Sequence, residues 1–336
     1  MPPPNQGEFD VYGFAFRLCG QAEAAIRDLA SDFQFFRRAA VSDPVTVELI
    51  CSDPPYDEVP EREASIYTPR NISFADGESI YVDYSGRGLG IWDRGQRRLR
   101  VYTRDPHLHY EVAYLFLLSQ VGEALDQRGM HRLHAMAMAY QGRSVLAILP
   151  MGGGKSTLAA SLLRYREFDF LSDDSPIVSR DGTVHAFPLR LGLLPGTEQE
   201  IPPDRLRVIQ RMEFGPKVLV NYEYFADRVK ASAEPGIVFL GRRSLSRECR
   251  IEPAGRGESY RSIVANCAVG LGLFQGLEFV LTQGPLAVAS KAGVAWSRFL
   301  AARRLFAKSE VYRLVLGRDS ERNADTVRQF VHERLG

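Results

Sequence analysis

The sequence has few cysteines, few lysines, almost no net charge and no long apolar run, and these shortages exclude several classes of protein. Among 336 residues there are only 4 cysteines, which lie far apart and form no C-x-x-C pair. We therefore expect neither a disulfide framework nor a zinc site. We expect the cysteines to be reduced. The net charge of +1 gives no indication of nucleic acid or an anionic membrane as partner. The basic residues are almost all arginine, a bias that we attribute to genome composition.

Segments that would target the chain to a membrane are also missing from the sequence. The first ten residues, MPPPNQGEFD, have no basic start and no apolar run, so a secretory signal peptide is not expected. The most apolar stretch, 112–121, is far shorter than the roughly 20 residues that span a bilayer. This stretch is more typical of a buried helix. We therefore expect a cytoplasmic protein with no membrane span and no nucleic-acid partner.

What is present is an ordinary globular composition, with 45% hydrophobic and 25% charged residues. The length favours two domains. Residues 1–128 show the pattern of an α+β domain for binding a substrate or a partner. Its expected strands are 9–18, 45–51, 65–68, 79–84 and 99–103, and its expected helices are 21–38 and 110–128.

The pattern changes after Gly129, and residues 129–336 are expected to form an α/β nucleotide-binding domain. Two apolar strands precede a glycine cluster, and a helix follows it at once. The expected strands are 133–140, 144–149, 168–171 and 311–316, with further extended segments at 184–194 and 236–240. The expected helices are 156–165, 285–306 and one at the end of the sequence.

The strongest motif is the segment SVLAILPMGGGKSTLAASLL, in which an apolar strand leads into a glycine-rich loop and a helix. This context is typical of a phosphate-binding loop, or Walker A motif. Glycines allow backbone amides to converge on phosphate oxygens, and the helix N-terminus adds its dipole. Lys155 would reach the β- and γ-phosphates, and the Ser156 hydroxyl would ligate Mg²⁺. The candidate nucleotide-binding residues are Gly152, Gly153, Gly154, Lys155, Ser156 and Thr157.

The motif departs from the usual pattern at its first position, where Leu149 replaces glycine. The alternative interpretation is a glycine-rich turn that happens to contain Lys-Ser. The flanking strand and helix favour the phosphate loop.

A second candidate feature is the acidic pair Asp173 and Asp174, which ends the short strand FDFLS. Ligands gather at the carboxyl ends of parallel strands, so these carboxylates are placed to hold a metal and to accept a proton. Since Asp-Asp-Ser-Pro also forms turns readily, a structural role is the alternative.

Together these motifs resemble the catalytic domain of HPr kinase/phosphorylase. In that family a histidine lies fifteen residues before the first position of the phosphate loop, as His134 lies fifteen residues before Leu149 here. Lys155 and Asp173 are eighteen residues apart, which is closely similar to the family spacing. The motifs cover roughly residues 130–195. Without this spacing, His134 would also fit a buried core position.

The resemblance implies a P-loop nucleotide-binding core of the HPr kinase/PEP carboxykinase type, with Mg²⁺ and ATP bound at the loop. One carboxylate of Asp173 and Asp174 would be the general base, and His134 would orient or tune the pair. The resemblance also implies a homo-oligomer, because HPr kinases form hexamers.

Two departures from the family point away from HPr as the substrate. Thr157 stands where the bifunctional enzymes have Glu. Residues 189–193 are only loosely similar to the family segment that is associated with phosphorylase activity. We therefore expect a diverged kinase whose acceptor is a serine-like hydroxyl of a peptide, a protein or a small molecule. Arg190 and Lys217 are further candidates for binding phosphate or substrate, with solvated surface positions as the alternative.

Two other functions fit the same motifs. The chain could be a nucleotide-dependent regulatory switch or ATPase that docks a partner without phosphorylating it. It could also be a carboxykinase-like enzyme acting on a small acid, although the additional metal-ligating residues this would require are not evident in the sequence.

Overall fold

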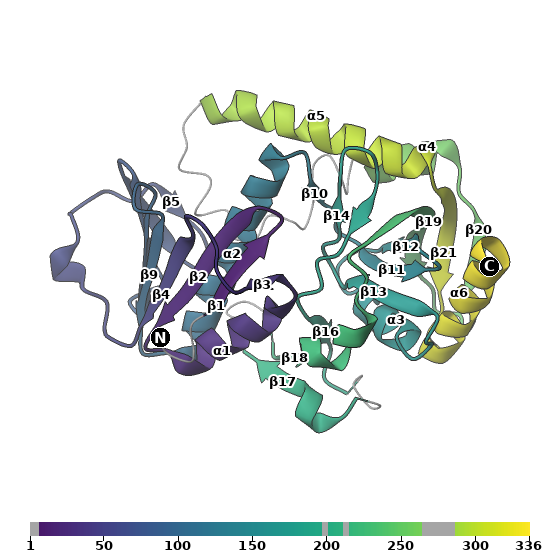
Figure 1. The fold of residues 1–336 in the computed structure, drawn as a ribbon, viewed down its shortest axis with the longest axis horizontal. Helices are drawn as coiled ribbons and strands as arrows, with labels where there is room; N and C mark the ends of the chain where they lie inside the picture. The colour runs from purple at the N-terminus through teal and green to yellow at the C-terminus, as the bar shows by residue number, and fades with distance from the viewer. Residues whose placement is uncertain (1–6, 197–200, 211–214, 264–285) are drawn as a thin grey trace. The chain divides into compact units, whose positions relative to one another are not determined.

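The computed structural model describes residues 7–196, 201–210, 215–263 and 286–336 and has a mixed α/β architecture (Figure 1). Two large mixed sheets and a small antiparallel sheet are present. The chain divides into two compact units, the first built mainly from residues up to Ala124 and the second mainly from Leu125 onward. Val208–Lys217 is assigned to the first unit.

The first unit contains a nine-stranded sheet in the order β3-β1-β2-β4-β9-β8-β7-β6-β5. Its strands are β1 (Gly7–Val11), β2 (Phe14–Gly20), β3 (Arg37–Arg38), β4 (Val45–Ile50), β5 (Ile66–Tyr67), β6 (Ile72–Asp76), β7 (Ser79–Asp83), β8 (Gly88–Asp93) and β9 (Arg98–Thr103). The helices are α1 (Glu23–Asp32) and α2 (Pro106–Gln127), the latter continuing into the second unit. Strands β2, β4 and β9 are parallel, and the remaining neighbours are antiparallel.

Alternation of apolar and polar residues explains these strands, because every second side chain of β1, β2 and β4 is buried. The helices cover this buried face. The Phe33 ring, directly after α1, packs on Phe16 with ring centroids 5.0 Å apart, and Phe116 of α2 packs on Trp92 at 4.8 Å. The hydroxyl of Tyr110 donates to buried Asp32 at 2.6 Å.

One expected strand, 9–18, is wrong in its middle, since Tyr12 and Gly13 form a turn between β1 and β2. Both residues have positive φ, 51° and 92°, as a two-residue hairpin requires. The expected helix 21–38 is also too long. It ends at Asp32, and the chain then pairs with β1 through Arg37 and Arg38.

The second unit contains a sheet in the order β10-β14-β15-β19-β12-β11-β13, extended by β21 beside β19 and β20 beside β21. Its strands are β10 (His131–Arg132), β11 (Met136–Tyr140), β12 (Arg143–Ile148), β13 (Phe168–Ser172), β14 (Ile177–Val178), β15 (Val184–His185), β19 (Ser232–Arg243), β20 (Arg250–Pro253) and β21 (Glu310–Leu316). The helices are α3 (Lys155–Leu162), α4 (Arg256–Ser262), α5 (Leu286–Ala307) and α6 (Ser320–Leu335). The small antiparallel sheet is β16-β18-β17, from β16 (Leu191–Leu193), β17 (Leu206–Ile209) and β18 (Lys217–Val220).

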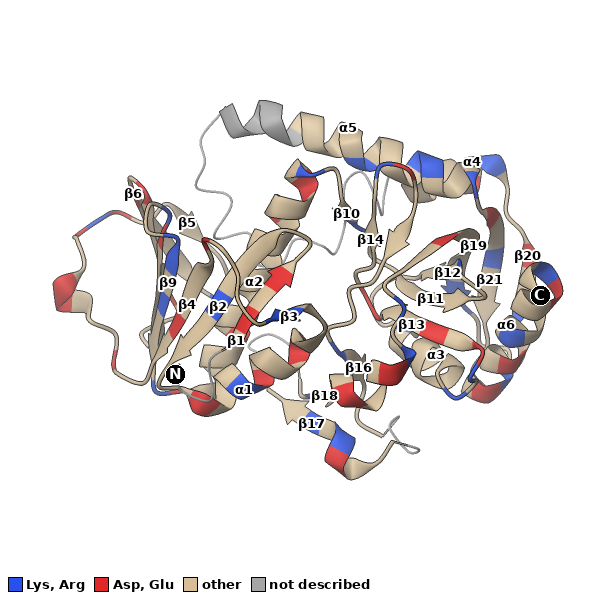
Figure 2. Cartoon of the chain, in the orientation of Figure 1, with Lys and Arg blue, Asp and Glu red and all other residues tan. Residues whose placement is uncertain are grey.

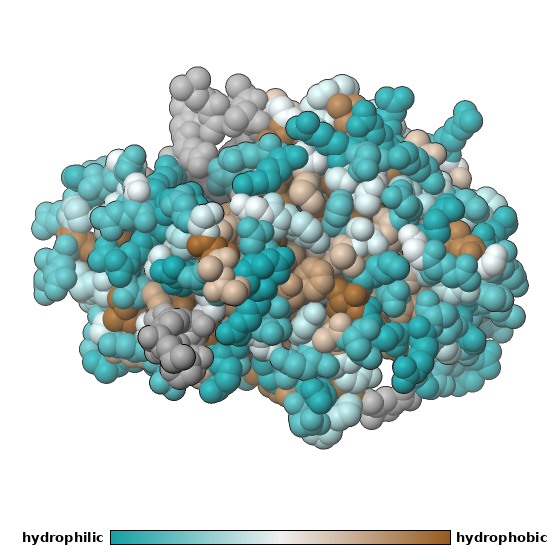
Figure 3. All heavy atoms as spheres, in the orientation of Figure 1, coloured by the Kyte–Doolittle hydropathy of each residue, from teal (hydrophilic) through white to brown (hydrophobic). Residues whose placement is uncertain are grey.

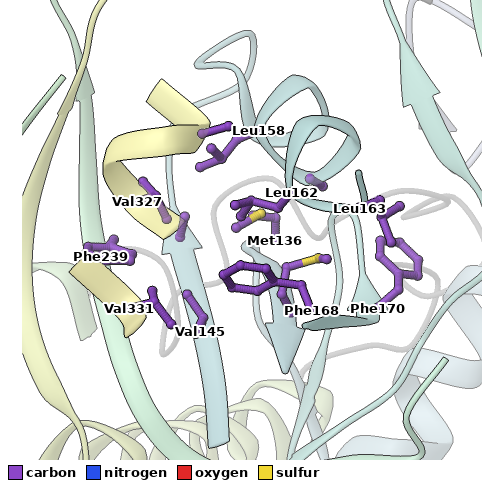
Figure 4. Close-up of a cluster of buried hydrophobic side chains, with 14 of the residues drawn as sticks. Met136, Val145, Leu158, Leu162, Leu163, Phe168, Phe170, Phe239, Val327 and Val331 are labelled. Carbon is purple, nitrogen blue, oxygen red and sulfur yellow. The ribbon is translucent and has the colours of Figure 1, made fainter. Parts of the chain in front are cut away.

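Helices α3 and α6 bury one face of this second sheet. Leu158 and Leu162 of α3 and Val327 and Val331 of α6 meet the strand side chains there, with Phe239 of β19 among them (Figure 4). All five side chains are at most 4% exposed. This packing fixes the start of α3 against the sheet.

Strand directions bring three connections to one edge of the second sheet. Strand β11 is antiparallel to both β12 and β13, so β12 and β13 run in the same direction. The end of β12, the end of β13 and the start of β11 therefore share an edge. Strands β19 and β21 are parallel to β12 and also end there.

In the part of the chain that the structure describes, no helix combines the length and apolar character needed to cross a bilayer. Hydrophilic residues cover most of the face drawn in Figure 3, with hydrophobic residues scattered among them.

Candidate functional site

The glycine-rich loop lies between the end of β12 and the start of α3 and makes a tight backbone turn. The Gly153 amide donates to the Pro150 carbonyl at 2.9 Å, and a Cβ on Gly153 would lie 2.8 Å from that oxygen. Gly154 precedes the first residue of α3 with φ of 98°, in the left-handed region that favours glycine. The loop therefore requires glycine at both positions, and its amides lead directly into the helix N-terminus.

The departure from the usual motif at Leu149 has a packing explanation. This side chain is only 1% exposed and belongs to the core between the sheet and α3. It fills the space left by Gly241 of β19, where an added Cβ would overlap Leu149. Position 149 is therefore a core position in this chain, and the turn itself begins after it.

Lys155, the first residue of α3, points back into the loop rather than toward solvent. Its side chain is 7% exposed, and Nζ donates to the Leu149 carbonyl at 2.8 Å. The same nitrogen lies 3.4 Å from the Pro150 carbonyl and 3.0 Å from His134 Nε2. Burial lowers the pKa of Lys155, while the carboxylates of Asp174 and Asp173 act in the opposite direction.

His134 follows β10, and the pairing of β10 with β14 places it beside Lys155. The ladder continues past its last pair through the Leu133 amide, which donates to the Pro176 carbonyl at 2.9 Å. His131 of β10 is itself fixed, since its ring nitrogens lie 2.8 Å from Asp126 and 2.8 Å from Ser297 of α5. The segment that carries His134 is thus held on both sides.

The protonation state of His134 follows from its neighbours. An ammonium group has donors only, so His134 Nε2 must accept from Lys155, and the ring proton lies on Nδ1. Burial, with the positive charge of Lys155 second, lowers the pKa of His134 to about 4. The imidazole is therefore neutral at pH 7 and turns its N–H edge toward Asp174.

The two aspartates after β13 occupy different environments. Asp174 has a side chain 47% exposed, and its Oδ1 lies 3.2 Å from His134 Nδ1 and 3.7 Å from Lys155 Nζ. The Nδ1–H of the neutral ring faces this carboxylate without hydrogen-bond geometry, so the contact is a close approach of an N–H group to a negative charge. Asp173 is buried, and its Oδ2 accepts from the Gly192 amide of β16 at 3.0 Å. An irregularity in the pairing of β11 with β13, next to Ser172, precedes the pair.

Ser156 and Thr157 occupy the second and third positions of α3 and are half-buried. A serine hydroxyl, an aspartate carboxylate and phosphate oxygens are the hard oxygen ligands that Mg²⁺ prefers. The residues at this edge of the sheet therefore fit Mg²⁺. Among the residues that the structure describes, no group of three or more His, Cys, Asp or Glu side chains forms a separate metal site.

The other two sequence candidates lie in or next to strands of the small sheet. Arg190 is half-buried directly before β16, two residues from the Gly192 amide that binds Asp173. Lys217 is half-buried at the start of β18, and its contacts assign it to the first unit. The distances given above bring the loop, His134 and Asp174 together, with Asp173 next to Asp174 in the chain.

Sequence reasoning missed Arg243, which ends β19 beside the loop. Its Nη1 would lie 3.1 Å from a Cβ placed on Gly154, so a guanidinium adjoins the start of α3. The expectation of an extended segment at 236–240 stopped three residues short of it. Because β19 is parallel to β12, continuing the strand to its carboxyl end would have identified this arginine.

Three of the four cysteines lie in the described part of the chain. Cys19, Cys51 and Cys249 are free thiols, and Cys267 lies outside the described residues.

No protein-family model matches the chain, and the search of curated proteins finds no match.

Proposed function

We propose that this chain is an ATP-dependent kinase of the HPr kinase-like type, which transfers the γ-phosphoryl group to a serine-like hydroxyl. One observation carries the proposal. Lys155 of the phosphate loop, His134 and Asp174 lie within 4 Å of one another at a single strand edge, although they come from three separate connections. A phosphate-binding lysine beside a half-exposed carboxylate is the arrangement that phosphoryl transfer to a hydroxyl requires.

In the proposed reaction, the amides of Gly152–Gly154 and the ammonium of Lys155 hold the triphosphate. The acceptor oxygen forms a bond to the γ-phosphorus while the bond from that phosphorus to the β,γ-bridging oxygen breaks, so that ADP leaves. Asp174 takes the proton of the acceptor hydroxyl, because its carboxylate is the more exposed of the pair. Mg²⁺ would be held by Ser156, the aspartates and phosphate, and it would neutralise charge on the phosphates.

Neutral His134 acts as a positioning residue in this scheme. Its Nδ1–H faces Asp174 and its Nε2 accepts from Lys155, so one ring sets the distance between the cation and the base. Arg243 adds a second positive charge beside the loop. Positioning and charge neutralisation supply most of the catalysis in phosphoryl transfer.

The test is a transfer assay with γ-labelled ATP, Mg²⁺ and a host extract separated into small-molecule, peptide and protein fractions. We expect label in one fraction, and we expect its loss with Lys155→Ala and with the Asp173→Asn/Asp174→Asn double variant. Turnover unchanged by Lys155→Ala would contradict the proposal. Label released only as free phosphate would identify an ATPase or a switch instead.

A further inference from the structure

A pocket of about 530 Å³ opens beside the phosphate loop in the second unit, on the side away from the aspartates. Three segments contribute to it: the end of β12 with the start of the loop, the end of β19, and helix α4, with one side chain from β21. The lining residues are Ile148, Leu149, Pro150, Leu240, Gly241, Arg242, Glu258, Arg261, Ser262 and Arg313. Its volume lies within the range of small-molecule sites, roughly 300–1,000 Å³.

The walls of the pocket divide into an apolar part and a basic part. The apolar part comes from the strand ends and includes Ile148, Pro150 and Leu240. The basic part comes from Arg242, Arg261 and Arg313, and basic residues also mark α4 in Figure 2. A lining that combines apolar side chains with guanidinium groups suits a planar ring, on which arginine can stack.

The charges of the pocket leave a positive excess. Glu258 is the one acidic residue of the lining, and Arg313 binds it with Nη2 at 2.7 Å. Arg242 Nη2 lies 3.0 Å from the same carboxylate, so both arginines share it. The pKa of Glu258 is lowered by its hydrogen bond to Arg313. Arg261 is exposed and has no ion pair within the described residues, so it remains available to a ligand.

The position of the pocket relates it to the phosphate loop. Leu149 and Pro150 line the pocket, and their carbonyl oxygens also accept from Lys155. In the sheet, β19 is separated from β13 by β12 and β11, which at the usual strand spacing is roughly 14 Å. The aspartates and the β19 side of the pocket therefore lie on opposite sides of the loop, at a separation comparable with the length of an extended nucleoside triphosphate.

We infer that this pocket receives the nucleoside end of the phosphoryl donor, with its base against the apolar wall and Arg261 stacked over it. The inference rests on the proposed function, because it requires the triphosphate to lie on the loop with its γ-phosphate toward Asp174. An acidic acceptor is the other ligand that the arginines could bind. The apolar wall and the distance from Asp174 favour the nucleoside.

Inorganic tripolyphosphate separates the two halves of this site, because it carries the phosphates of ATP without a nucleoside. Binding of Mg-ATP and Mg-tripolyphosphate to the full chain would be measured by calorimetry. We expect the wild type to bind ATP roughly tenfold or more tightly than tripolyphosphate. Ser262→Trp, which fills the pocket, should reduce ATP binding to the level of tripolyphosphate. Arg261→Ala should weaken ATP binding roughly three- to tenfold.

Two controls distinguish the pocket from the loop and from the helix. Tripolyphosphate binding should be unchanged in both pocket variants, which also shows that they are folded, whereas Lys155→Ala should abolish the binding of both ligands. Arg256→Ala, an exposed position on α4 outside the lining, should leave both affinities unchanged.

Several results would overturn the inference. Pocket variants that bind ATP as tightly as the wild type exclude the nucleoside from this pocket, and a selective rise in the acceptor KM would assign it to the acceptor. Equal weakening of both ligands would mean that the variants act on the loop. If the wild type binds neither ligand, the proposed function itself fails and the inference falls with it.

Discussion

Lys155 Nζ lies 3.0 Å from His134 Nε2, so the lysine of the glycine-rich loop donates a hydrogen bond to a neutral histidine. The two residues are twenty-one positions apart and reach each other only through the fold of the second unit. Since the positive charge of one disfavours protonation of the other, a ligand that draws Lys155 toward phosphate would also change the basicity of His134.

The first prediction tests this coupling. Lys155→Met removes the charge that, after burial, contributes most to the low pKa of His134. We therefore expect the pKa of His134 to rise from about 4 toward the ordinary histidine value, which burial alone still keeps it from reaching. The titration of the His134 ring would be followed by NMR.

Lys155→Arg is the matched control, because it retains the charge and should keep the pKa of His134 low. A pKa that stays at its wild-type value in Lys155→Met would show that the lysine does not influence the histidine.

The second prediction concerns acid stability. The pKa of His134 is about 4 in the folded chain and is near 6.5 when the chain unfolds, so the unfolded state binds the proton first. Protonation of the unfolded state therefore lowers the free energy of unfolding as the pH falls from about 6.5 toward 4, and this loss is absent above about pH 6.5. Its size is at most about 3 kcal/mol. His134→Gln should therefore reduce the loss of unfolding free energy between pH 7 and pH 4.5, measured by urea denaturation.

His107→Gln serves as the comparison, because it makes the same replacement at an exposed position. Acid sensitivity will persist in part in His134→Gln, since burial also lowers the pKa of His109 and of His185. A pH dependence identical to that of the wild type would argue against a buried neutral His134.

Patterns in the sequence were sufficient for the mixed α/β class and for most strands that alternate apolar and polar residues, such as β4. They failed where a single backbone conformation decides the structure. The turn at Tyr12 and Gly13 splits one expected strand into a hairpin, and its only local signal is one glycine. The expected helix 21–38 failed because pairing of Arg37 with β1 competes with the helix, which is a long-range effect.

The candidate site likewise combines residues that the sequence predicted with distances that it did not predict. A motif spacing identified Lys155, His134 and the aspartates as candidates, but the distances among them depend on β11 running antiparallel between β12 and β13. That strand order could not be predicted from the sequence, because it depends on long-range pairing. The same is true of Arg243, which reaches the loop only because β19 lies beside β12.

The third prediction separates the two aspartates. Asp174→Asn changes a half-exposed carboxylate and should abolish phosphoryl transfer while leaving the melting temperature nearly unchanged. Asp173→Ala removes the acceptor of the buried Gly192 amide and should cost about 1–3 kcal/mol of stability. Asp173→Asn retains an oxygen that can accept from this amide and should recover most of that loss. The measurements are labelled transfer and urea denaturation on all three variants.

The assignment of Asp174 as the base would be wrong if Asp174→Asn retained turnover while Asp173→Asn lost it. Equal loss of stability in Asp174→Asn and Asp173→Ala would contradict the difference in burial between the two carboxylates.

The last prediction concerns the backbone of the loop, and a second glycine in the same unit provides its control. Gly154 has φ of 98° and Gly142, in the turn between β11 and β12, has φ of 80°. Alanine at either position would be strained by roughly 1–2 kcal/mol. Both variants should lower the melting temperature, but only Gly154→Ala changes the amides that lead into α3 and crowds Arg243. We therefore expect Gly154→Ala to lose ATP and tripolyphosphate binding and Gly142→Ala to retain both, as measured by calorimetry. Because the two variants share the same kind of strain, equal loss of binding would trace the effect to general destabilisation. Wild-type binding by Gly154→Ala would mean that the loop backbone does not hold phosphate.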